Sequence, residues 1–200
     1  MKLSKQKIFL IIIISFAFLI GCSRNKSYIE DYEYGLLYTS NSGSVVSLYD
    51  KQGENLGEKN LNVSGITFGS FMKNGIEVKD KLYYAAPLAG SNQQDFVVEM
   101  DKDKLSVSKI KSTGVTPTFF SSDGKYTFSG ISSLNNSQII KTDIEKNKVI
   151  GTNELEGQGI NMIEDGNQLY ILSINHNDSG KSTSGNLYTI DKSSFKVLNK

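Results

Sequence analysis

The stretch Ser121-Ser122-Asp123-Gly124-Lys125-Tyr126-Thr127-Phe128 decides the fold of this chain. Its Asp-Gly pair favours a tight hairpin, because glycine accepts the positive φ angle that such turns require. Tyr126, Thr127 and Phe128 follow at once, and aromatic and β-branched residues are typical of strands. The stretch therefore predicts the end of one strand, a hairpin and the start of the next strand.

Looser copies of this hairpin lie on both sides of it in the sequence. The later copy, Asp165-Gly166-Asn167-Gln168-Leu169-Tyr170, keeps the Asp-Gly pair, whereas the earlier one, Asp80-Lys81-Leu82-Tyr83, lacks the glycine. Tyr38 lies in a comparable run near the N-terminus, and the four tyrosines are 45, 43 and 44 residues apart. This regular return predicts a structural repeat. We expect the recurring tyrosines to pack between neighbouring repeats.

An aspartate also recurs, each time at the end of a strand-like run. A lysine-rich turn and another short run follow it, which predicts a hairpin whose carboxylate caps its own turn. We expect the lysines beside these aspartates to lie outside and keep the sheet edges soluble. The four turns begin at Asp50, Asp101, Asp143 and Asp191.

The short runs rich in Val, Ile, Tyr, Thr and Phe predict an all-β chain, and its 18 glycines against two prolines suit many tight turns. Residues 66–72, 116–120 and 160–163 are candidates for the first strand of each later unit. Four strands in each period of about 44 residues predict the blades of a β-propeller. A β-sandwich, the alternative, gives no reason for a tyrosine to return at so regular an interval.

The stretch from Ser121 to Tyr126 resembles the Ser-x-Asp-Gly-Lys-aromatic turn of YVTN-like and quinoprotein-like propellers. The resemblance runs from residue 34 to the end of the chain and implies about four blades, fewer than such rings usually have. The first unit begins near Tyr34 at its second strand and the last unit stops within its outer strand, so we expect an incomplete ring. No unit contains a literal Tyr-Val-Thr-Asn, and the absence of tryptophan excludes the WD type.

The N-terminal segment has a different character and ends at Leu19-Ile20-Gly21-Cys22. Three lysines begin it, residues 8–20 are almost wholly apolar, and a small glycine precedes the only cysteine, an order typical of an export signal. The apolar run is shorter than the about 20 residues that a membrane span needs. The last four residues resemble the lipobox of bacterial lipoproteins, which implies cleavage between Gly21 and Cys22 and a diacylglyceryl group on the Cys22 sulfur.

These signals divide the chain into a lipoprotein signal peptide (1–21), a polar tether (22–33) and a propeller-like domain (34–200). We expect the protein on the extracytoplasmic face of the bacterial cell membrane, because two fatty acyl chains such as palmitate hold a protein firmly where one does not. Cleavage lowers the net charge from +1 to −2, and this balance argues against nucleic acid as a partner. With Cys22 acylated, no thiol remains for a disulfide or a thiolate site.

A polar loop between two strands of the fourth unit contains the candidate ligand-binding residues His176, Asn177 and Asp178. The chain has one histidine, so a cluster of histidine metal ligands is impossible. The loop also lacks the regular spacing of a calcium-binding loop. We predict no metal site, no cofactor and no catalytic residue.

Three functional classes stay open. The first is a lipid-anchored binding or scaffold protein that holds an envelope protein, a small molecule or a glycan with the loops of a rigid frame. The second is an exported enzyme resembling the propeller lactonases or quinoprotein dehydrogenases, which would need convergent acidic residues, a metal or a quinone pocket. The third is a structural protein that helps to assemble the envelope. We predict the first class, with the exported enzyme as the alternative.

Replacing the predicted lipidation site tests the anchor. The Cys22→Ala variant should lose labelling by a radioactive fatty acid and leave the membrane fraction, because no other cysteine can carry the acyl group. Phase separation of both proteins in a cloud-point detergent measures this. A variant that enters the detergent phase as well as the parent does would show that the anchor lies elsewhere.

Overall fold

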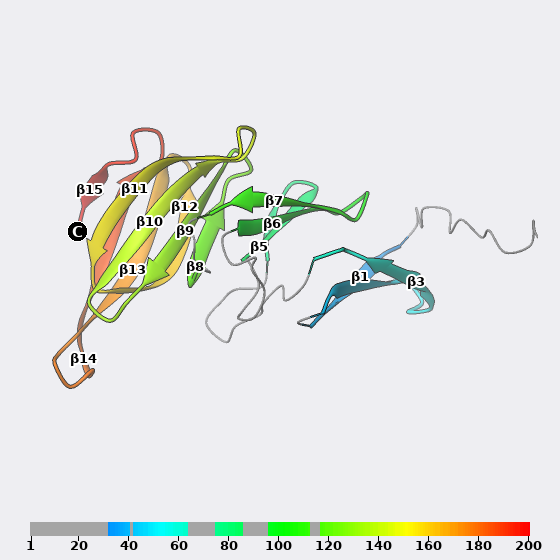
Figure 1. Cartoon of the computed structure of the whole chain (residues 1–200), viewed down its shortest axis with the longest axis horizontal. Coiled ribbons are helices and arrows are strands. Elements are labelled where there is room, and N and C mark those ends of the chain that lie inside the picture. Colours follow the sequence, from blue (N-terminus) through cyan, green and yellow to red (C-terminus); the bar gives the residue numbers. More distant parts are fainter. Residues whose placement is uncertain (1–31, 41, 64–74, 86–95, 113–116) are drawn as a thin grey trace, which may run out of the picture.

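The computed structural model describes residues 32–40, 42–63, 75–85, 96–112 and 117–200 (Figure 1). These residues form fifteen strands and no helix. Accordingly, none of the described elements is a helix long and apolar enough to cross a membrane. The all-β prediction is confirmed.

The strands form four antiparallel sheets, each running through consecutive strands. The first sheet has three strands: β1 (Tyr34–Thr39), β2 (Ser44–Tyr49) and β3 (Asn55–Asn60). The second has β4 (Ile76–Val78), β5 (Lys81–Ala85), β6 (Phe96–Asp101) and β7 (Ser106–Lys111). The third has β8 (Phe119–Ser122), β9 (Tyr126–Ser132), β10 (Asn136–Asp143) and β11 (Lys148–Glu156). The fourth has β12 (Gln158–Asp165), β13 (Gln168–His176), β14 (Ser182–Asp191) and β15 (Val197–Asn199).

This order is the arrangement of propeller blades that the repeat predicts. The first sheet begins, as expected, with the counterpart of a second strand. Of the predicted first strands, 160–163 lies inside β12, and 116–120 overlaps β8 at its last two residues. The candidate at 66–72 lies outside the described residues, and the described first strand of the second sheet is β4.

The four recurring tyrosines lie on corresponding strands but not at one register. Tyr83 and Tyr170 are equivalent, because each lies two residues after the partner of a turn aspartate. In the third sheet Phe128 holds that position, and Tyr126 itself pairs with Asp143. Tyr83 is buried as expected and Tyr126 and Tyr170 are half-buried, but Tyr38 is 57% exposed, so the packing prediction is wrong for Tyr38.

The sheets follow one another across the molecule in chain order (Figure 1), and an apolar core fills each of the three junctions. Each core joins one face of a sheet to the facing side of the next, as in stacked propeller blades. The cores include Val46 and Tyr84 between the first and second sheets, Val97 and Phe120 between the second and third, and Ile139 and Ile171 between the third and fourth.

The recurring aspartates cap their own turns, as the sequence predicts. The Asp101 carboxylate accepts a hydrogen bond from the backbone N–H of Lys104 at 2.8 Å, and Asp143 accepts one from Lys146 at 2.9 Å. Asp191 accepts one from Ser194 at 2.6 Å, and Asp50 accepts two in its own turn, at 2.9 and 2.8 Å. These bonds fix the path of the chain between the last two strands of each sheet.

The residue four positions after the capping aspartate has a left-handed backbone in three of the sheets. Its φ angle is 47° at Leu105, 47° at Asn147 and 55° at Phe195. Each of these residues reaches back to the preceding sheet: Leu105 and Phe195 enter its apolar core, and Asn147 accepts a hydrogen bond from the Lys111 N–H at 2.6 Å. We call Leu105, Asn147 and Phe195 the wedge residues. In the first sheet the turn instead places Gly53 at φ 81°.

The wedge at Phe195 fits a space that a glycine leaves open. A Cβ atom built on Gly151 of β11 would lie 2.6 Å from the Phe195 ring, closer than a side chain allows. The ring also lies 6.3 Å from the ring of Phe128, measured between centroids. The third and fourth sheets therefore interlock at their outer strands.

The Phe195→Ala variant tests the importance of this wedge. We expect the free energy of unfolding to fall by about 3–5 kcal/mol, the usual cost of removing a buried aromatic ring. Urea unfolding followed by circular dichroism measures it. The control Leu198→Ala removes an exposed side chain three residues later and should change the stability by less than about 0.5 kcal/mol. Equal losses in the two variants would contradict the interlocking.

Candidate functional site

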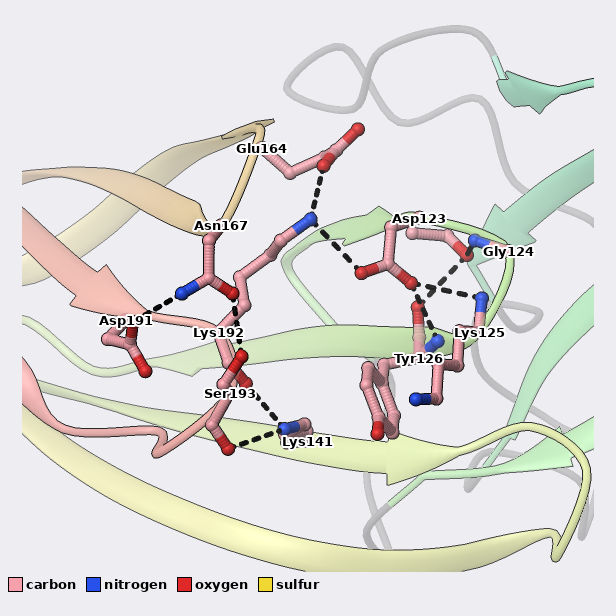
Figure 2. Close-up of polar contacts among 11 residues, drawn as sticks. Asp123, Gly124, Lys125, Tyr126, Lys141, Glu164, Asn167, Asp191, Lys192 and Ser193 are labelled. Atoms are coloured by element: carbon pink, nitrogen blue, oxygen red, sulfur yellow. Dashed lines mark hydrogen bonds and ion pairs between the residues drawn. The ribbon is translucent and has the colours of Figure 1, made fainter.

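A cluster of polar side chains lies between the third and fourth sheets (Figure 2). Lys192, directly after the capping Asp191, is buried. Its ammonium group lies 3.1 Å from a carboxylate oxygen of Asp123 and 2.6 Å from one of Glu164. Asp123 comes from the β8–β9 hairpin of the third sheet and Glu164 from β12 of the fourth, so one lysine joins the two sheets. The prediction that the turn lysines lie outside is wrong for Lys192.

The hairpin that carries Asp123 is the stretch on which the fold prediction rests. Gly124 has φ 81°, as an Asp-Gly hairpin requires, and the Asp123 carboxylate accepts hydrogen bonds from the N–H groups of Lys125 (3.0 Å) and Tyr126 (2.8 Å). Burial disfavours the charged form of Asp123, but the two N–H groups and Lys192 outweigh it and hold its pKa below the usual value. For Lys192, burial acts to lower the pKa, and the two carboxylates outweigh it and raise the pKa.

A second lysine, Lys141 of β10, lies beneath this cluster with only 3% of its surface exposed. Its ammonium group donates hydrogen bonds to the carbonyl oxygens of Lys192 and Ser193 and lies 4.1 Å from the centre of the Tyr126 ring. Carbonyl oxygens and an aromatic face both stabilise a cation. Lys141 therefore holds the last turn of the fourth sheet onto the third.

The ion pair of Lys192 with Glu164 belongs to the repeat. In the second sheet Lys102 also follows a capping aspartate, and it pairs with Glu77 of β4. Glu77 and Glu164 are equivalent, since each pairs across the sheet with the second residue of the next strand. In the third sheet Ser122 and Ile144 take these places. The cluster is thus an elaborated structural element of the blades, and its charges are used in holding the sheets together.

A cleft of about 330 Å³ lies between the first and second sheets. Its walls come from the end of β3 with the residues after it and from β6 and β7. Apolar side chains alternate with polar ones along both walls, so the cleft offers both apolar and polar surface. The apolar lining residues are Leu61, Val63, Val98, Leu105 and Val107, and the polar ones are Lys59, Asn60, Asn62, Ser106, Ser108 and Lys109.

The backbone around the cleft is fixed by the same turn chemistry as the blades. Asn62 adopts φ 51°, and its N–H donates to the Asn60 side chain at 2.8 Å. Leu105, the wedge residue of the second sheet, supplies the floor. On the other wall the Lys109 ammonium lies 4.7 Å from the centre of the Phe96 ring.

The predicted ligand-binding residues lie together at the end of the β13–β14 hairpin. His176 contacts the carbonyl oxygen of Gly180 at 3.1 Å and the Gln158 side chain at 2.9 Å. The Asn177 side-chain oxygen accepts from the Lys181 N–H at 2.9 Å and so caps the loop. Asp178 is exposed. His176 and Asn177 thus hold the loop in shape, and the ligand-binding role of the three residues stays a prediction.

The predicted lipidation and cleavage residues, Cys22 and Gly21, lie outside the described residues. Within the ranges that the structure describes, no three His, Cys, Asp or Glu side chains are grouped so that they could hold a metal ion. Sequence reasoning did not find the cleft, because its two walls are about 45 residues apart in the chain. The wedge position after Asp101 is the one sequence signal that points to it.

Comparison with known proteins bears on the fold alone. The chain is similar to Kuenenia stuttgartiensis hydrazine synthase, with a TM-score of 0.50 and 16% identity over 82% of this chain and 50% of that one. For BamB from Moraxella catarrhalis the TM-score is 0.42 and the identity 16%, over 70% of this chain and 38% of that one. For the AtxE2 isopeptidase the TM-score is 0.41 and the identity 7%, over 93% of this chain and 30% of that one. No family model and no curated protein sequence matches the chain.

The chain thus spans half or less of the length of these solved structures. The four antiparallel sheets, three of them four-stranded, their stacking in chain order and the likeness to propeller proteins define a β-propeller-like protein.

The Asp123→Asn variant tests the lysine cluster. Asparagine keeps the hairpin cap but removes the charge, so we expect a loss of about 1 kcal/mol at pH 7, as for a partly exposed ion pair. Because the pKa of Asp123 is lowered by folding, its contribution is complete above about pH 4 and disappears as the pH falls through the folded pKa.

The parent and the variant should therefore converge in stability once the pH lies below the folded pKa of Asp123, which urea unfolding at several pH values measures. Asp178→Asn, in the exposed loop, is the control and should match the parent at pH 7. A constant difference between Asp123→Asn and the parent at every pH would show that the charge is unimportant.

Proposed function

We propose that this protein is a lipid-anchored, non-catalytic binding protein of the extracytoplasmic membrane face. The observation that carries the proposal is the cleft between the first and second sheets. Small-molecule sites are concave and largely apolar, with a few polar groups that fix orientation, and they begin near about 300 Å³. The cleft has this size and this mixture of side chains.

The lining of the cleft indicates the chemistry of the ligand. The lining residues include two lysines and no carboxylate, with four side chains from asparagine and serine that donate and accept hydrogen bonds. The apolar floor suits an aliphatic or ring-shaped part of the ligand. A small amphipathic molecule with an anionic or carbonyl group fits both features, and so does a glycan with acidic groups.

The arrangement of the charged side chains favours binding over catalysis. A catalytic carboxylate or lysine has to meet the substrate, but Asp123 and Glu164 are paired with Lys192. The turn aspartates accept hydrogen bonds from their own turns, and Lys141 is enclosed by carbonyl oxygens and rings. These groups are used to fix the frame. The exported-enzyme alternative has no observation of this kind in its favour.

The membrane location rests on the sequence. Residues 19–22 resemble a lipobox, and a diacylglyceryl group would supply the two chains that stable anchoring needs. On this proposal the tether carries the cleft away from the bilayer. An envelope protein is a second class of partner, for which the exposed loop with His176, Asn177 and Asp178 is the proposed contact.

Reversing one charge of the cleft tests the binding role. Anilinonaphthalene sulfonate combines a ring system with an anionic group, and we expect it to bind the parent protein with increased fluorescence. Lys59→Glu should weaken that binding by about tenfold, equivalent to about 1.4 kcal/mol, since it replaces attraction by repulsion.

The matched control is Lys148→Glu, a charge reversal at an exposed position on β11 outside the cleft. It should bind the dye as the parent does. Equal affinities of all three proteins would contradict the cleft as the site. Circular dichroism of each variant confirms that the fold is retained.

A further inference from the structure

The outer face of the fourth sheet is apolar and has no neighbour among the described residues. The other face of this sheet packs on the third sheet through Leu169, Ile171 and Ile190. Leu172 and Leu187 pair across β13 and β14 on the outer side and are 41% and 57% exposed. Ile163 of β12 lies on the same side, opposite Tyr170, and is 50% exposed.

Among the described residues, the first sheet has a similar face without a neighbour at the other end of the stack. Leu37, Val46 and Leu48 belong to the core with the second sheet. The alternate residues of β1 point to the opposite side, because successive side chains of a strand alternate. They are Tyr34, Leu36 and Tyr38, which are 55%, 50% and 57% exposed.

We call the face of a sheet that contacts the following sheet its forward face, and the face that contacts the preceding sheet its backward face. The register of the repeat shows that the outer face of the fourth sheet is a forward face. Leu187 lies four residues before its capping aspartate, as Val46, Val97 and Ile139 do before theirs. Those three residues are covered by the following sheet and are 3%, 0% and 0% exposed, against 57% for Leu187. Leu187 therefore holds an interface position that no sheet of the described residues covers.

Comparing pairing positions relative to the capping aspartate in the same way shows that the outer face of the first sheet is a backward face. Leu36 pairs with the residue three positions before its capping aspartate, as Tyr84, Ser129 and Ile171 do. Those three are covered by the preceding sheet and are 9%, 0% and 0% exposed, against 50% for Leu36. One chain therefore carries both sides of the same repeating interface, one at each end.

We propose that a second copy of this chain covers these faces, with the fourth sheet of each copy packing on the first sheet of the other. The contact continues the stacking already present at the three internal junctions, so each forward face receives the backward face for which the repeat is built. Two different faces in contact make a head-to-tail interface, which closes into a ring when the rotation allows. Two copies bring the described sheets of both chains together, four from each, and cover both apolar faces. This proposal is independent of the ligand in the cleft.

The experiment uses the full chain carrying Cys22→Ser, which removes the only native thiol. Leu36→Cys and Leu187→Cys are added singly and together, and a short bismaleimide links thiols that lie close together. In sedimentation, the Cys22→Ser protein should have the mass of two copies. The bismaleimide should link two chains covalently in the double variant, and also in a mixture of the two single variants. Each single variant alone should stay unlinked, because the two copies of one residue lie on opposite sides of the ring.

Leu187→Asp should reduce the sedimentation mass to that of one copy, since it places a carboxylate in the apolar contact. The control Leu134→Asp changes a leucine that is equally exposed, at 55%, in the β9–β10 hairpin away from both faces, and it should keep the mass of two copies. A parent protein of one-copy mass overturns the proposal and leaves the faces to another occupant, such as further sheets. Open-ended oligomers, or linking within a single variant, overturn the closed head-to-tail ring.

Discussion

The structure depends on the aspartate that caps the turn between the last two strands of each sheet. Its hydrogen bonds to the backbone fix that turn. In three sheets the residue four positions after the aspartate then lies in the left-handed region. This conformation costs about 1–2 kcal/mol for a residue with a side chain. Burial of Leu105 or Phe195 in the preceding sheet contributes about 1.5–3 kcal/mol, which offsets the cost. One local bond thus determines how two sheets meet.

The junctions between the sheets differ in what fills them. Between the third and fourth sheets the wedge, the lysine pair and the apolar core act together. Between the first and second sheets the wedge residue Leu105 forms the floor of the cleft. On the proposed function, the junction of the third and fourth sheets holds the shape of the frame and the cleft between the first and second receives the ligand, which is the usual division between scaffold and site.

The sequence predicts what local chemistry decides. The Asp-Gly hairpin at 123–124, the aspartate caps and the four-strand period are confirmed, since each depends on neighbouring residues. The tyrosine register could not be read correctly, because Phe128 and Tyr126 exchange roles within two residues of each other. The burial of Lys192 and the cleft between the first two sheets depend on which distant segments meet, and only the fold determines that.

The enclosure of Lys141 has a consequence for how the protein opens. Its amine is covered by the last turn of the fourth sheet and by the Tyr126 ring, so an acylating reagent in solution can reach it only after that turn has separated. The rate at which this one lysine is modified in the native protein therefore reports the local opening of the final blade. Modification would also keep the turn open, because an acylated, neutral Lys141 can no longer hold the turn that covered it.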